Sequence, residues 1–186
     1  MITVKSDASG SGRWCFFVVH GDGEADLVWG RLSGDDAAVH VPYYELAAVY
    51  ECVAQFGHTW SGRRVRFGVD SAPVMYALNN GTSRDVHMMR LLREIEVAGL
   101  RHAFEHYAVH TTRTMNQLTD QGTRHTIAQD FASYLPAEGF DRTAAKGTAA
   151  PSQCSSLLTN DGRTLLRLGQ QHRCSAPGRA SDTTTQ

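Results

Sequence analysis

The sequence has 186 residues, of which 41% are hydrophobic and 20% charged, and its formal net charge is −1. This length and balance are typical of a soluble globular protein with one ordinary domain and a core of its own. The sequence shows neither a run of about 18 apolar residues nor the basic and apolar regions of a signal peptide, so we expect no membrane span and no secretion signal.

The cysteines and the charge distribution narrow the class further. Four cysteines, at positions 15, 52, 154 and 174, show no Cys-x-x-Cys spacing, so we expect reduced thiols in an intracellular protein, in either nucleus or cytoplasm. Basic side chains outnumber acidic ones after residue 140, and the preceding part is therefore acidic. An acidic domain is unusual for a protein that binds nucleic acid without the help of another domain. It fits acids that form a metal site, because bound cations reverse the local sign.

The first half of the chain alternates between predicted strands and one helix. Segments rich in aromatic and β-branched residues predict an antiparallel meander of strands over 2–7, 13–19 and 26–32. Pro42 begins a predicted helix that runs to Phe56, and a strand over 64–70 follows. A strand after a crossover helix pairs most naturally in parallel with the first strand. This would place Asp7 and Asp70 side by side.

The second half is mainly helical. Helices are predicted over 71–78, with Ser71 as the cap, over 85–99 and over 116–126, and a strand over 104–110. Residues 127–140 are expected to extend or cover the last helix. The tryptophans, at positions 14, 29 and 60, are interpreted as core residues.

The composition changes after Phe140. Residues 141–186 contain no Phe, Trp, Tyr, Ile, Val or Met, so they bury too little to offset their ordering entropy. The sequence predicts a domain over 1–138 and a low-complexity, disordered tail over 139–186, with at most a turn of helix at 165–168.

Four acids stand where they could converge. Asp7 ends the first predicted strand and is followed by small residues and glycines, which lets a metal and a phosphate approach closely. Glu45 lies on the first helix, Asp70 ends the fourth strand and Asp120 lies on the last helix. Carboxylates from different elements are what a pair of Mg²⁺ ions requires.

The order β-β-β-α-β-α-α-β-α with these acids resembles the ribonuclease H type 1 domain, in the style of retroelement reverse transcriptases. Four stretches carry the resemblance: Ser6-Asp7-Ala8-Ser9-Gly10, Tyr44-Glu45-Leu46-Ala47-Ala48, Val69-Asp70-Ser71, and His110-x5-Asn116-x3-Asp120 with Arg124 following. The resemblance implies an α/β, RNase H-like fold with a five-stranded mixed sheet and helices on both faces.

The resemblance also implies an activity. The chain would be a Mg²⁺-dependent endonuclease that cuts the RNA strand of RNA–DNA hybrids with two ions, with Mn²⁺ as a substitute. Asp7 would bridge both ions, Glu45 and Asp70 would hold one, and Asp120 would help hold the other. His110 would relay protons or help the product leave.

Contacts to the substrate are expected from further residues. The predicted nucleic-acid-binding residues are Ser9, Gly10, Ser71, Asn116 and Arg124, with Ser9 and Gly10 meeting the RNA sugar. The expected partners are an RNA–DNA hybrid and an upstream reverse-transcriptase domain.

Some features depart from the family pattern. Val41 stands where a polar residue is frequent, and the basic insertion of some members is missing between Leu78 and Arg101. Asp7 lies close to Met1, as in a domain cut from a polyprotein. The alternative is therefore a catalytically inactive, structural or nucleic-acid-binding remnant of a retroelement. An exonuclease is disfavoured because the first strand has no Asp-x-Glu pair, and an integrase because the helix glutamate lies between the first two aspartates.

Overall fold

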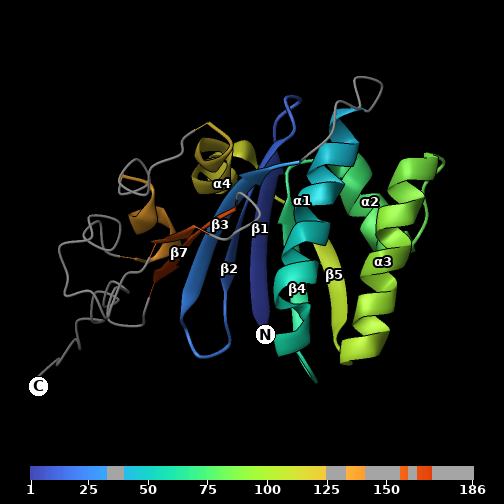
Figure 1. Ribbon diagram of the computed structural model, residues 1–186, viewed down its shortest axis with the longest axis horizontal. Helices are drawn as coiled ribbons and strands as arrows, with labels where there is room; N and C mark the ends of the chain where they lie inside the picture. Colours follow the sequence, from blue (N-terminus) through green and yellow to red (C-terminus); the bar gives the residue numbers. More distant parts are fainter. Residues whose placement is uncertain (33–39, 125–132, 141–155, 159–162, 169–186) are drawn as a thin grey trace, which may run out of the picture.

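One mixed sheet organises the protein (Figure 1). The computed structural model describes residues 1–32, 40–124, 133–140, 156–158 and 163–168. The strands are β1 (Ile2–Ala8), β2 (Arg13–Val19), β3 (Ala25–Arg31), β4 (Arg64–Val69), β5 (Glu105–His110), β6 (Ser156–Leu158) and β7 (Thr164–Leu168). Their order across the sheet is β5-β4-β1-β2-β3-β7-β6.

Four α-helices are described together with short 3-10 turns. The α-helices are α1 (Val41–Phe56), α2 (Ala72–Asn80), α3 (Val86–His102) and α4 (Gln117–Gly122). The 3-10 turns are η1 (Gly57–Thr59), η2 (Arg113–Asn116) and η4 (Leu135–Glu138). The last helix is shorter than predicted, and the extension expected over 127–140 lies largely outside the described residues. Within the described ranges, no helix is both long and apolar enough to span a membrane.

The predicted meander and crossover are confirmed. β1 pairs antiparallel with β2, and β2 with β3, as short links between strands require. After α1 the chain returns as β4, which pairs in parallel with β1, with Lys5 opposite Gly68. Because the two strands are parallel, their C-terminal ends lie side by side at the same end of the sheet. Together with β5 parallel to β4, it is the strand arrangement of the RNase H-like fold.

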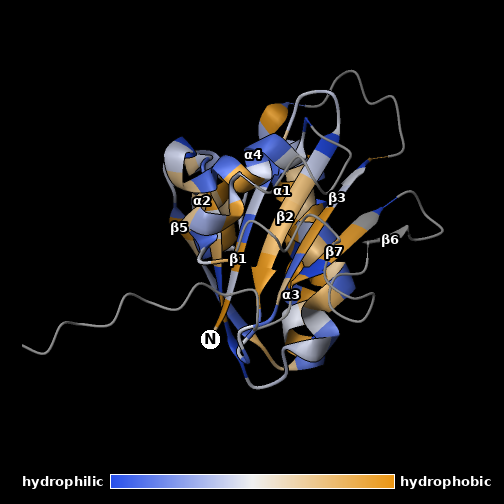
Figure 2. Ribbon diagram, turned by 90° about the vertical axis from the view of Figure 1, so that its left-hand side faces the viewer, coloured by the Kyte–Doolittle hydropathy of each residue, from blue (hydrophilic) through white to orange (hydrophobic). Residues whose placement is uncertain are grey.

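Helices cover both faces of the sheet. α1, α2 and α3 lie on one side and α4 on the other (Figure 1). Each side has its own apolar core: Val4, Phe16 and Leu92 belong to the first, and Phe17 and Leu118 to the second. β2 is buried on both faces and is hydrophobic along most of its length (Figure 2). Successive side chains of β2 therefore point into opposite cores, and the strand contributes to both.

Two strands come from the segment that composition predicted as tail. β7 pairs antiparallel with β3, and β6 with β7. Residues 165–168 are a strand rather than the predicted turn of helix. Leu165 packs into the first core, while Leu166 and Leu168 pack into the second, which is the two-sided pattern of a strand. The rest of the predicted tail lies outside the described residues.

Ion pairs fasten β7 to the body of the domain. Arg167 donates from Nε to Asp26 Oδ1 at 2.8 Å and from Nη2 to Oδ2 at 3.2 Å. Arg163 lies 2.7 Å from Glu51 on α1. Asp26 is 1% exposed, and His20 Nε2 also lies 2.9 Å from its Oδ2. The buried charge is therefore fully partnered, as a buried carboxylate requires.

The tryptophans are in the core, as predicted. Trp14, Trp29 and Trp60 are all at most 5% exposed. The Trp14 ring lies so close to Gly30 that a Cβ at that position would be 2.7 Å from its Cζ2 atom. Cys15 and Cys52 are buried free thiols, which agrees with the expectation of reduced cysteines for these two positions.

The β5 edge of the sheet is closed by a side chain. Asn79 on α2 donates from Nδ2 to the Ala108 carbonyl at 2.9 Å, and its Oδ1 accepts from the Ala108 amide at 2.8 Å. The amide side chain thus takes the place that a neighbouring strand's peptide group would fill.

Candidate active site

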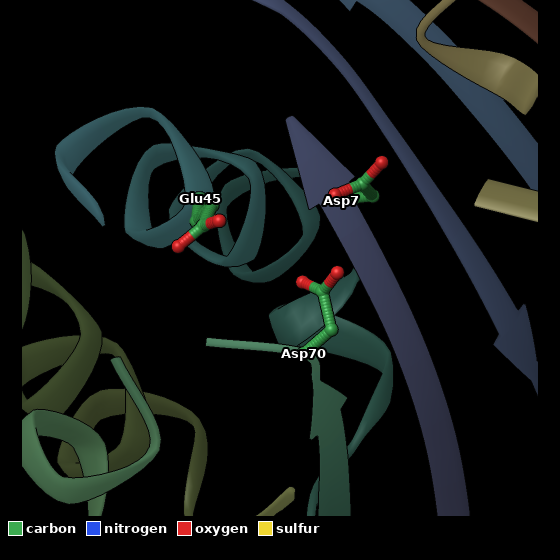
Figure 3. Close-up of side chains that lie close together, drawn as sticks. All are labelled: Asp7, Glu45 and Asp70. Atoms are coloured by element: carbon green, nitrogen blue, oxygen red, sulfur yellow. The ribbon is translucent and has the colours of Figure 1, made fainter. Parts of the chain in front are cut away.

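Three carboxylates meet at the edge where β1 and β4 end. Asp7 lies near the end of β1, and Asp70 follows β4 directly. Glu45 lies near the start of α1, which begins at Val41 with Pro42 in its first turn. One ligand oxygen from each of the three lies within 4.8 Å of the others. Figure 3 shows the three side chains pointing toward a common space. The proximity of Asp7 and Asp70 follows from the parallel register, as the sequence predicted.

The cluster is electrostatically unfavourable without a cation. Burial raises the pKa of Asp7 from 3.8 to about 7, and the charges of Asp70, Asp120 and Glu45 add to the effect, against a hydrogen bond from the Ala8 amide. Burial also raises the pKa of Glu45, with the Asp70 charge adding and a hydrogen bond from the Ser71 hydroxyl opposing. A bound cation removes this repulsion, because it supplies the opposite charge.

The donor set fits a hard divalent cation. Oxygen ligands from carboxylates are those that Mg²⁺ and Mn²⁺ prefer. Glu45 Oε2 is buried and has no hydrogen-bond partner among the described residues. A buried, unpartnered carboxylate oxygen is costly unless something binds it. Asp7, Glu45 and Asp70 are therefore the residues that would hold a cation.

Asp120 lies beside this trio but does not belong to it. The influence of its charge on the pKa of Asp7 places it near the cluster. Its carboxylate is engaged on α4, where Arg124 Nη2 donates to Oδ1 at 3.1 Å and Gln121 Nε2 to Oδ2 at 3.4 Å. Among the described residues, Asp7, Glu45 and Asp70 form the one group of three or more ligands close enough to share an ion.

His110 is at the end of β5, next to the cluster. Its Nε2 lies 3.2 Å from the backbone oxygen of Asp70, and the residue is exposed. An imidazole at this position is open to solvent and contacts the backbone of Asp70, one of the three acidic residues. The position suits proton transfer at the site's rim.

The β1–β2 turn presents backbone next to Asp7. The Ser9 amide donates to the Arg13 carbonyl at 2.8 Å, and Ser9 Oγ lies 2.8 Å from Ser11 Oγ. Gly10 is exposed, and Gly12 has a φ of +77°, a conformation that favours glycine. The turn therefore leaves Gly10 accessible beside the carboxylates.

Ser71 and Asn116 both make contacts within the protein. Ser71 is at the N-cap position of α2, but its side chain makes no cap hydrogen bond, because its hydroxyl is directed at Glu45. Asn116 is 1% exposed, and its Nδ2 donates to the Ser6 carbonyl at 2.9 Å. The amide therefore ties η2 to β1, while its Oδ1 is buried and has no hydrogen-bond partner among the described residues. The expected contact of Asn116 with nucleic acid stays a prediction.

Arg124 remains on the surface. Its side chain is 58% exposed and pairs with Asp120, four residues earlier. Its carbonyl oxygen accepts from Arg13 Nη1 at 3.2 Å. The Arg13 side chain therefore links the β1–β2 turn to the backbone that follows α4.

Sequence reasoning missed one charged residue next to the site. Lys5 lies two residues before Asp7 and, by the alternation of a strand, on the same face of β1. It forms an ion pair with Glu138. The available signal was a lysine inside a short strand of otherwise small or apolar residues, since such a charge requires a partner.

Comparisons with known proteins show similarity at the level of solved structures. No family model and no curated protein matches the chain. One similar structure is the N-terminal RNase H domain of a Mycobacterium tuberculosis protein, at 13% identity over 64% of this chain and 88% of that chain, with a TM-score of 0.47. LC11-RNase H1, in complex with an RNA/DNA hybrid, is 14% identical over 65% of this chain and 92% of that one, with a TM-score of 0.47.

A third similar structure is the RNase H1 of Halobacterium salinarum, at 16% identity, 64% and 92% coverage and a TM-score of 0.41. At such identities and TM-scores these likenesses carry no argument about function. The fold assignment rests on the order and pairing of the strands in this chain.

Proposed function

We propose that the chain is a divalent-cation-dependent endonuclease that hydrolyses the RNA strand of RNA–DNA hybrids. The observation that carries the proposal is the meeting of Asp7, Glu45 and Asp70, whose oxygens lie within 4.8 Å of one another at one edge of the sheet. The raised pKa of Asp7, about 7, supports it, because perturbed carboxylates of this kind cluster at functional sites.

The cofactor of this proposal is Mg²⁺, with Mn²⁺ as a substitute. When bound, it stabilises negative charge at the phosphate and lowers the pKa of a water, so that hydroxide is available as the nucleophile. Asp7, Glu45 and Asp70 would hold one ion, and Asp7 with Asp120 the second. For Asp120 to take part, its carboxylate must part from the Arg124 guanidinium, and the exposed Arg124 side chain is free to move away.

The surrounding residues have separable roles in the proposal. Ser9 and Gly10 present backbone to the RNA sugar, and Ser71 orients Glu45. His110 moves a proton at its exposed imidazole. Arg124, next to Arg13, binds phosphate and offsets the acidic surroundings.

The proposal extends to the origin of the chain. The Asp120-x3-Arg124 ending and the Asn80-Gly81-Thr82-Ser83-Arg84 stretch support descent from a retroelement reverse transcriptase. An upstream polymerase domain would then contribute part of the grip on the hybrid, inside the cell.

The test is cleavage of a hybrid labelled on its RNA strand, with Mg²⁺ present. We expect cleavage by the unmodified chain and loss of it in Asp70→Asn and Glu45→Gln. The matched control is Glu94→Gln, which changes an exposed acid on α3 and leaves the cleavage rate unchanged. Equal cleavage by the unmodified chain and Asp70→Asn would contradict the proposal, since contaminating nuclease would then explain the activity.

A second candidate is a non-catalytic, hybrid-binding module of the same fold. The pairing of Asp120 with Arg124 at 3.1 Å favours it, because this pair keeps the fourth carboxylate out of the trio. Measuring binding of the same labelled hybrid alongside its cleavage separates the two candidates. Binding without Mg²⁺-dependent cleavage supports the module.

A further inference from the structure

Lys5 is a charged residue in β1, which lies between β4 and β2 in the interior of the sheet. Its side chain is 17% exposed. Its Nζ donates to Glu138 Oε1 at 2.7 Å, to Glu138 Oε2 at 2.8 Å and to the Met115 carbonyl at 2.8 Å. An ammonium group has three protons to donate. Each of the three N–H groups of Lys5 Nζ thus has an acceptor oxygen.

The acceptors come from two segments that precede and follow α4 in the chain. Met115 belongs to η2, which leads directly into α4, and Glu138 ends η4. The Glu138 side chain is 10% exposed. Lys5 therefore joins three segments that are distant in sequence: β1, η2 and η4.

A second hydrogen bond, one residue further along each segment, also joins η2 to β1. Asn116, after Met115, donates from Nδ2 to the carbonyl of Ser6, after Lys5, at 2.9 Å. The Asn116 carbonyl in turn accepts from Thr119 Oγ1 at 3.0 Å. Two consecutive residues of η2 are therefore bonded to two consecutive residues of β1, at the start of the helix that carries Asp120.

We propose that Lys5 and Glu138 are positioning residues that set α4, and through it the Asp120 carboxylate, against Asp7. The inference rests on the proposed function, because it assigns Asp120 a share in cation binding. β1 carries both Lys5 and Asp7. Any shift of η2 along β1 therefore changes the distance between the two aspartates directly.

Stability alone does not account for such a pair. A partly buried ion pair can be replaced by apolar residues of similar size at little loss of folding free energy, because the charges no longer have to leave water. An apolar pair cannot hold the Met115 carbonyl. Replacing the pair by apolar residues should therefore keep the stability of the protein but lose the placement of α4. A purely structural ion pair would affect stability alone.

The first measurement is hydrogen exchange of backbone amides in the full chain without metal. We expect Lys5→Met to raise the exchange of residues 113–122, with β4 and β5 unchanged, and Lys5→Arg to restore part of the protection. The matched control is Arg64→Met, which removes the exposed ion pair with Glu105 and leaves the exchange of 113–122 as it was. Unchanged exchange of 113–122 in Lys5→Met would overturn the proposal, whatever the activity of the protein.

The second measurement is the apparent affinity for Mn²⁺, obtained from the cation's effect on thermal stability. We expect Lys5→Met to weaken it about tenfold, the lower end of the effects of residues that orient metal ligands. The double variant Lys5→Met/Glu138→Met should recover stability but not affinity. In an Asp120→Asn background, where the trio still binds, Lys5→Met should cause no further weakening.

The outcomes separate this inference from the proposed function. Equal weakening by Lys5→Met with and without Asp120 would overturn the positioning role, because Lys5 would then act through Asp7 or through the fold. If the unmodified chain cleaves the hybrid while Lys5→Met binds Mn²⁺ normally, the inference fails and the function stands. If the unmodified chain neither binds Mn²⁺ nor cleaves, the proposed function fails, and with it the role assigned to Asp120.

Discussion

Asp26 and Arg167, which are 141 residues apart, form a two-pronged ion pair at 2.8 and 3.2 Å. Asp26 lies on β3 and is 1% exposed. Burial alone would raise its pKa, but hydrogen bonds from His20 and Arg167 outweigh burial, and the pKa lies below 3.8. The link fixes β7 to the sheet, and it has a predictable dependence on pH.

Arg167→Gln is expected to lower the free energy of unfolding by about 1–3 kcal/mol at pH 7, because a buried carboxylate loses a charged partner. A carboxyl group with a depressed pKa stabilises the fold above its unfolded pKa, and this contribution disappears as the pH falls through the folded value. The difference between the two proteins in urea unfolding should therefore be constant from pH 7 to about pH 5 and shrink below about pH 4.

The control for this prediction is Arg63→Gln. Arg63 lines the same cavity as Arg167, and in the described ranges its side chain makes no ion pair. A difference that persists unchanged to pH 3 would contradict the role of Asp26 ionisation.

Asp7→Asn is expected to stabilise the metal-free protein at pH 8. The pKa of Asp7 is raised to about 7, so between about pH 4 and pH 7 the folded chain holds a proton that the unfolded chain has lost. Stability therefore falls as pH rises through this window and stays low above it. The asparagine removes the buried charge and should raise the unfolding free energy by about 1–3 kcal/mol at pH 8.

Thermal unfolding in EDTA at pH 5 and pH 8 measures this effect. At pH 5 the gain from Asp7→Asn should be smaller, because the native carboxyl is then already neutral. A variant that is less stable than the unmodified chain at pH 8 would show that Asp7 is satisfied without a cation.

Mg²⁺ or Mn²⁺ is expected to raise the melting temperature of the unmodified chain, and more strongly at pH 8 than at pH 6. The cation requires the ionised form of Asp7, whose pKa is about 7, so its affinity increases as this proton is lost. At a hundred times the dissociation constant the gain is about 2.7 kcal/mol. Glu45→Gln should lose most of this gain and Glu94→Gln none. An equal gain in both variants would indicate non-specific cation binding.

Gly30→Ala is expected to destabilise the protein by about 1–3 kcal/mol, the usual result of overpacking a core. The added Cβ would lie 2.7 Å from Trp14 Cζ2, and the ring is 1% exposed and stacked on Phe16. Chemical denaturation measures the change. The matched control is Gly10→Ala, where the nearest atom to the new Cβ is 3.8 Å away; a similar loss in both would contradict the role of the Trp14 contact.

The sequence was sufficient for the parts of the structure that local patterns dictate. Alternating and helical periodicities predicted β1 to β5 and α1 to α3. The crossover helix required a parallel partner for β1, and this placed Asp7 beside Asp70. Glu45 could be added through the family resemblance, since a helix-surface acid has no local signal that distinguishes it from a ligand.

Other features depended on tertiary contacts that composition does not reveal. Asn116 begins the last predicted helix and no local pattern predicts its burial, yet it is buried and its amide donates to the Ser6 carbonyl. Residues 165–168 are too few to predict a strand alone, and β7 forms because β3 offers a free edge and Asp26 a buried charge. Asp120 lies on the predicted helix, but its ion pair with Arg124 depends on a rotamer that no sequence pattern specifies.

The Asn79 side chain that caps Ala108 has a consequence for solutions of the protein at high concentration. An open sheet edge is a template for further strands, and stacking through such edges leads to aggregation. Here one amide group occupies the hydrogen-bonding position at Ala108 in β5, and β7 pairs with β3 from Ala25 to Trp29. Asn79→Leu would keep the helix but uncover the Ala108 peptide group, and the first species to form would be dimers joined through β5.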